Sequence, residues 1–178
     1  MGRSVGSWAG YVACLWGLAF AAISFYWGMG GTLGLDSLGG SLERLARAHD
    51  RTILIAVWVT GFLKVLVALL GLALAGTWAA RLPRLPVTVL GWVAAVSLAL
   101  YGGTLVVTEA LVTFGAIKPA QPVDWKPLLW HLYVWDLSFL VWGVLLGVAT
   151  SCRRKHVPVG NSAPEDCYVV AAICHALE

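Results

Sequence analysis

Charged residues are scarce in this sequence. They make up 12% of its 178 residues, whereas 60% are hydrophobic. A water-soluble domain of this length cannot bury so much apolar surface. The formal net charge is only +3, and the basic residues lack the aromatic interleaving typical of nucleic-acid binding, so we expect no nucleic-acid partner. The composition therefore predicts an integral membrane protein.

Several catalytic signatures are missing as well. The sequence contains no P-loop, no dinucleotide-binding fingerprint, no H-E-x-x-H and no G-x-S-x-G elbow. Its four cysteines form no C-x-x-C pair, and no other spacing resembles a zinc site or a disulfide framework. We therefore expect no metal and no cofactor.

Four long apolar runs are present, at about residues 8–29, 52–78, 87–117 and 128–150. Each is close to the roughly 20 residues that cross a bilayer as an α-helix. The first run is longer than the core of a signal peptide and ends in aromatic residues and glycines, so we interpret it as a retained helix. The sequence thus predicts an all-α fold, a four-transmembrane-helix bundle over residues 1–150. The tail, residues 151–178, is too short to span again, and we expect it to be disordered.

The orientation of the bundle depends on Lys and Arg in the loops. Six of them lie on the side of the two termini and five on the other side, a split that barely discriminates. The basic cluster at 153–155 directly follows the last apolar run, which favours both termini, and therefore the tail, in the cytoplasm.

Three ionisable residues interrupt the apolar runs: Lys64, Glu109 and Asp136. A charge at the centre of a membrane helix costs about 2.5–3.5 kcal/mol on insertion scales, so each needs an explanation. The helical rise places all three at about 12–18 Å from the same membrane surface. Each shares its helix face with glycine or alanine, and small residues line the interfaces between membrane helices. We therefore expect the three charges to point into the bundle.

This placement predicts an intrabundle polar pocket for a lipophilic small molecule, in contact with membrane lipids. Glu109 is the candidate proton donor, Asp136 the group that tunes or relays the proton, and Lys64 the cation that keeps one acid ionised. The candidate substrate-binding residues are Tyr26, Trp27, Asp36, His131 and Trp135. His131 is expected to lie off the Asp136 face of an α-helix, where anchoring at the interface is its simpler role.

Other interpretations of the same residues remain open. Lys64 and an acid are equally consistent with a structural ion pair between helices. The acids also suit a proton-coupled carrier or channel-like subunit, which would require a homo-oligomer because four helices are few for a transporter. A third hypothesis is a structural subunit of a membrane complex, with the charges as assembly pairs.

Two stretches carry a family resemblance: Phe25–Leu35, with Tyr26-Trp27 followed by a glycine pair, and Trp135–Gly143. They resemble a family of small bacterial four-helix membrane proteins of unknown function. The resemblance implies a four-helix bundle in a bacterial, actinobacterial inner membrane, and no activity. The site is also similar in type to that of integral membrane terpene cyclases, in which intramembrane acids protonate an isoprenoid. That likeness implies an isoprenoid- or quinone-like substrate and a cyclase or isomerase reaction, but no cyclase motif matches residue by residue.

Overall fold

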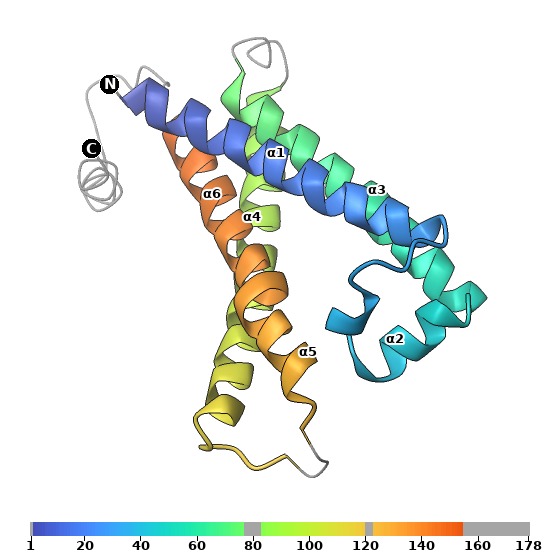
Figure 1. Cartoon of the computed structure of the whole chain (residues 1–178). Helices are drawn as coiled ribbons and strands as arrows, with labels where there is room; N and C mark the ends of the chain where they lie inside the picture. The colour runs from blue at the N-terminus through green and yellow to red at the C-terminus, as the bar shows by residue number, and fades with distance from the viewer. Residues whose placement is uncertain (1, 77–82, 120–122, 155–178) are drawn as a thin grey trace, which may run out of the picture.

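The computed structural model describes residues 2–76, 83–119 and 123–154, and all regular secondary structure in them is helical. In chain order the elements are α1 (Gly2–Gly28), the short 3-10 helix η1 (Leu35–Ser37), α2 (Gly40–Arg47), α3 (Arg51–Ala75), α4 (Arg84–Thr113), α5 (Trp125–Trp130), the π-helical segment η3 (His131–Trp135) and α6 (Asp136–Arg154). Figure 1 shows their arrangement.

Four stretches of these helices are long and apolar enough to cross a membrane: Val5–Gly28, Arg51–Ala75, Arg84–Thr113 and Trp125–Cys152. They confirm the predicted all-α class and lie within a few residues of the predicted runs. The last helix extends to Arg154, so the predicted tail begins inside it. The remainder of that tail, residues 155–178, and the predicted end of the second run at residue 78 lie outside the described residues.

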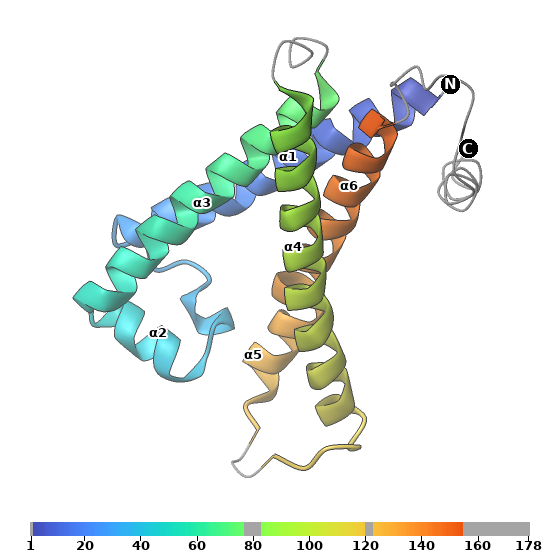
Figure 2. The same cartoon turned by 180° about the vertical axis from the view of Figure 1, so that it is seen from behind.

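The long helices associate in two pairs, α1 with α3 and α4 with α6 (Figures 1 and 2). The pairs meet where α1 crosses α6, at Trp142, which is 1% exposed and packs against Gly17. From there they diverge toward the end that carries the first and third loops, and η1 and α2 lie between the diverging ends. The membrane helices therefore form a V rather than a parallel bundle.

Glycine allows the close approach within each pair. A methyl group built on Gly10 of α1 would lie 2.7 Å from the carbonyl oxygen of Gly71 on α3, and one built on Gly143 of α6 would lie 2.6 Å from the backbone nitrogen of Ala99 on α4. Backbone contacts of this kind take the place of a hydrophobic driving force in the membrane. The expectation that small residues face the interior is confirmed at both interfaces.

The end of α1 is a glycine-dependent helix stop. Gly30 has φ 92°, a conformation that only glycine adopts without strain. The N–H of Gly31 donates to the carbonyl of Tyr26 at 2.9 Å, which closes a Schellman motif and satisfies a carbonyl at the helix end. Gly115, with φ 74°, ends α4 in the same way, which is why that helix stops before the predicted Ile117.

Candidate functional site

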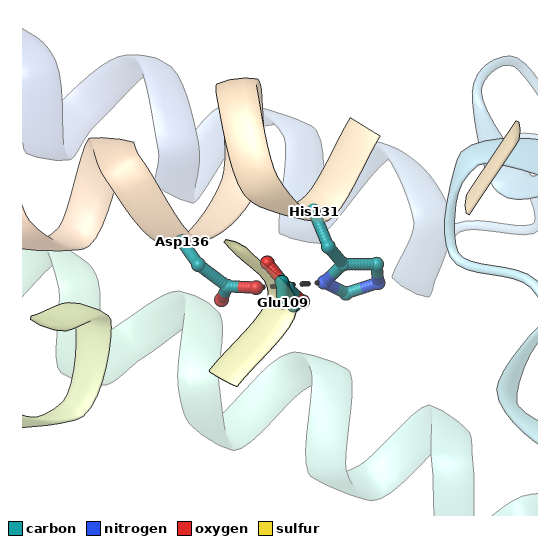
Figure 3. A group of neighbouring side chains, drawn as sticks. All are labelled: Glu109, His131 and Asp136. Atoms are coloured by element: carbon teal, nitrogen blue, oxygen red, sulfur yellow. Dashed lines mark hydrogen bonds and ion pairs between the residues drawn. The ribbon is translucent and has the colours of Figure 1, made fainter. Parts of the chain in front are cut away.

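Three ionisable side chains gather between α4 and α6 (Figure 3). Glu109 belongs to α4, His131 opens the π-helical segment, and Asp136 is the first residue of α6. Nδ1 of His131 lies 3.0 Å from Oδ2 of Asp136. One ligand-type atom from each of the three residues lies within 4.8 Å of the other two. We call these three residues the Glu–His–Asp cluster.

The π-helical turn explains why His131 belongs to the cluster. In a regular α-helix, residues five apart point in different directions. Here the backbone N–H of Asp136 donates to the carbonyl of His131, an i→i+5 bond that widens the turn and places both side chains on one face. The prediction that His131 lies off the Asp136 face is therefore wrong. π-bulges occur frequently at functional sites, but hydrophobic periodicity gives no signal for one.

The cluster is short of compensating positive charge; Asp136 is buried, and Glu109 and His131 are partly buried. The side chain of Asp136 is 3% exposed and that of His131 27% exposed, while Oε2 of Glu109 is buried without a hydrogen-bond partner. In the part of the chain that the structure describes, no Lys or Arg forms an ion pair with either acid. Two carboxylates this close cannot both be ionised in a low-dielectric site without a cation, and a protonated His131 supplies only one positive charge.

Lys64 does not supply the missing charge. Its Nζ donates to Oγ of Ser24 at 2.7 Å and lies 6.0 Å from the ring centroid of Phe139. Within the described residues it forms no ion pair, so the expectation that Lys64 holds one acid ionised is wrong, as is the alternative of a structural pair with an acid. Oxygen and π-electron contacts satisfy a membrane ammonium without an acid. Neither Ser24 nor Phe139 was predicted, because a serine or a phenylalanine in an apolar run carries no distinguishing signal.

This arrangement predicts an asymmetric mutational result. Ser24→Ala should lower the free energy of unfolding by about 1–2 kcal/mol, because it leaves the Lys64 ammonium without its hydrogen bond. Lys64→Met should lower the free energy of unfolding by less than Ser24→Ala does, because it also removes the unfavourable free energy of placing a charge in the membrane. Thermal unfolding of the two variants and of the double variant measures the difference. A cost of Ser24→Ala that persists in the Lys64→Met background would contradict the pairing.

The aromatic residues predicted to bind substrate hold the first loop against the fourth span. Nε1 of Trp27 donates to the carbonyl of Leu33 at 2.8 Å, and the N–H of Leu33 donates to the Tyr26 hydroxyl at 3.3 Å. Nε1 of Trp135 donates to Oγ of Ser37 at 3.0 Å, and the Trp27 and Trp135 ring centroids lie 5.4 Å apart. The two stretches that carry the family resemblance therefore contact each other. Substrate binding by these residues stays a prediction.

Asp36 lies at the surface rather than in the cluster. It forms an ion pair with Lys126 in which both side chains are at least half exposed. The hydrogen bond from Lys126, together with its charge, holds the pKa of Asp36 below its ordinary value. Exposed pairs of this kind contribute little to stability. The contact joins η1, which contains Asp36, to α5, which contains Lys126.

A second aromatic group borders the cluster. Phe20 of α1 contacts Trp135 and Phe139 of the fourth span, with ring centroids 5.8 and 5.9 Å apart. Tyr101 of α4 contacts Phe139 edge-on at 5.4 Å. Trp135 directly precedes Asp136 in the sequence and Phe139 follows it by three residues, and with Phe20 and Tyr101 their rings form one contiguous aromatic group. Phe20, Phe139 and Tyr101 are not among the site residues predicted from the sequence.

The fold and the cluster define a class: a small all-α membrane protein with four candidate spans and an ionisable cluster between two of them. Within that class, the chain belongs to a family described as "Protein of unknown function (DUF3995)", whose model matches residues 17–146. The match includes all three cluster residues and confirms the resemblance noted from Phe25–Leu35 and Trp135–Gly143. No curated protein and no solved structure matches the chain.

Proposed function

We propose that this protein is a membrane-embedded enzyme or binding protein that acts on a lipophilic small molecule by acid–base chemistry at the Glu–His–Asp cluster. The observation that carries the proposal is a pair of acids and an imidazole held within 4.8 Å between two candidate spans, without a Lys or Arg partner among the described residues. Such an arrangement is costly in a membrane, and intramembrane acids are generally retained for function. Nδ1 of His131 lies 3.0 Å from Oδ2 of Asp136, which suits Asp136 to tune or relay a proton, and Glu109 lies beside them as the proton donor.

We base the substrate class on the aromatic residues that accompany the acids along the fourth span. Phe20, Phe139, Tyr101 and Trp135 contact one another in a group that includes sequence neighbours of Asp136. Aromatic side chains pack well against flat or unsaturated apolar groups. We infer an isoprenoid- or quinone-like molecule that enters from the lipid and places a polar or reactive group at the cluster. We place the protein in a bacterial cytoplasmic membrane with both termini in the cytoplasm.

The test is mass spectrometry of small molecules that copurify with the detergent-solubilised protein. Wild type should retain an isoprenoid or quinone at close to one molecule per chain, and Glu109→Gln and Asp136→Asn should each reduce that occupancy by about tenfold or more, which corresponds to the loss of a charge-assisted hydrogen bond. Glu43→Gln, which changes an acid in the exposed α2 helix, is the matched control and should leave occupancy unchanged.

Two results would contradict the proposal. Equal occupancy in wild type, Glu109→Gln and Asp136→Asn would mean that the copurifying lipophile does not bind at the cluster. Bulk phospholipid alone in every preparation would favour a carrier or a structural subunit instead. A stable monomer in detergent would then argue against the carrier, because four helices are few for a transport path.

A further inference from the structure

We propose that the Glu–His–Asp cluster binds a divalent transition-metal ion, such as Zn²⁺, through Glu109, Nδ1 of His131 and Oδ2 of Asp136. Nothing in the family description assigns a metal to these residues. The inference concerns the same site as the proposed function and names what the site holds, but it rests on the geometry of the three ligands and stands whether or not a lipophilic substrate is found.

Ligand chemistry is the first argument. One imidazole and two carboxylates suit borderline divalent ions such as Zn²⁺, Fe²⁺ and Mn²⁺ and lack the thiolates that select soft ions. Three protein ligands are also typical of catalytic zinc sites, which leave a fourth position for water or substrate. A divalent cation would balance the charge of both carboxylates, with which no Lys or Arg forms an ion pair among the described residues.

Distance is the second argument. Two ligands on a tetrahedral ion with bonds near 2.0–2.1 Å lie about 3.3 Å apart, and Nδ1 of His131 and Oδ2 of Asp136 are 3.0 Å apart. All three ligand atoms lie within 4.8 Å of one another. Because Nδ1 and Oδ2 face each other in a hydrogen bond, closure onto an ion requires a rotation of that pair together with a shift of the side chain of Glu109. Its Oε2 is buried and has no hydrogen bond to give up, and the side chain ends in rotatable bonds.

The surroundings of the ligands are the third argument. The π-helical turn fixes His131 and Asp136 on the same face by the bond between their backbones. Glu109 is fixed from the opposite helix by the close packing of α4 against α6. The ligands thus come from two tightly packed elements rather than from a mobile loop.

The experiment is a titration of the full-length, detergent-solubilised protein, stripped with EDTA, with Zn²⁺ by calorimetry and with Co²⁺ by visible absorption. Wild type should bind one ion per chain, and the Co²⁺ complex should show ligand-field bands without a thiolate charge-transfer band. Glu109→Gln and His131→Ala should each weaken binding by more than the roughly 10–100-fold that loss of a second-shell partner costs.

Two controls exclude other ligands. His49→Asn changes an exposed histidine whose left-handed backbone, φ 51°, asparagine tolerates; it should leave the affinity unchanged. The combined variant Cys167→Ser, Cys174→Ser, His156→Asn and His175→Asn removes the cysteines and histidines at positions 156–175 and should bind as wild type does.

The outcomes separate the metal from the substrate. Absence of one-to-one binding by wild type, affinity unchanged in Glu109→Gln and His131→Ala, or a thiolate band in the Co²⁺ spectrum would each overturn the metal site. The Co²⁺ spectrum of wild type is decisive even where a cluster variant fails to fold. Metal binding without a copurifying lipophile would leave this inference standing and remove the proposed function; a lipophile lost in Glu109→Gln without metal binding would do the reverse.

Discussion

Glu109→Gln is expected to make the metal-free protein more stable, raising its free energy of unfolding by about 1–3 kcal/mol. In wild type, Oε2 of Glu109 is buried without a partner, and two acids face each other with only His131 to offset their charge. The glutamine amide removes one acid and adds N–H groups that can donate to the Asp136 carboxylate. Functional sites commonly lower the stability of the folded protein, and replacing a functional acid by a neutral residue then raises it.

The measurement is thermal or denaturant unfolding in detergent with EDTA present. Glu43→Gln is the matched control, since Glu43 pairs with Arg47 at 2.8 Å in exposed α2; its effect should stay within about 0.5 kcal/mol. If Glu109→Gln lowers stability instead, Glu109 is a structural group and its role in the proposed function loses its basis.

Zn²⁺ should reverse the order of the two proteins. A ligand that binds only the folded state stabilises it by about 4.1 kcal/mol at a free concentration one thousand times its dissociation constant. Wild type should gain that stability and Glu109→Gln should gain much less, because it has lost one of the three proposed ligands. If wild type becomes the more stable protein as Zn²⁺ is added, the stability lost at the cluster is explained by its role in binding the metal.

The sequence predicted the membrane helices well because composition and run length are sufficient for that purpose. It also placed Glu109 and Asp136 at matching depth and on faces lined by small residues, and the structure brings them together. Both predictions depend only on regular α-helical geometry. Such predictions of depth and helix face are correct wherever the helix is regular, because each residue is then rotated from the preceding one by the same angle.

The wrong predictions concern a residue beside an irregular turn and a residue whose hydrogen-bond partner carries no recognisable sequence signal. His131 was placed on the wrong face because the chain widens into a π-turn between it and Asp136. Lys64 was expected to pair with an acid, yet it bonds to Ser24 forty positions away in the sequence. No local pattern marks either feature, since a widened turn and a serine in an apolar helix depend on tertiary packing.

Gly102→Ala is expected to have the largest effect on the fold and to disturb the cluster at the same time. A methyl group on Gly102 would lie 2.5 Å from the backbone nitrogen of Leu140 and 2.6 Å from the carbonyl oxygen of Asp136. Both are backbone atoms, so no side chain can move aside, and α4 must separate from α6. Overpacking of this kind costs about 1–3 kcal/mol, more than the roughly 0.5–1 kcal/mol that alanine gains over glycine within a helix.

The neighbouring residue provides the control. A methyl group on Gly103 would meet only a side-chain carbon of Leu140, at 3.8 Å, so Gly103→Ala should be neutral or stabilising. Unfolding in detergent and Zn²⁺ titration of both variants test the two consequences together. The added methyl group would press on the carbonyl oxygen of Asp136, a proposed metal ligand. Gly102→Ala should therefore lower both metal affinity and stability, whereas Gly103→Ala should keep both. Equal behaviour of the two variants would mean that α4 and α6 do not pack through Gly102, and the distance between Glu109 and Asp136 would then have no structural support.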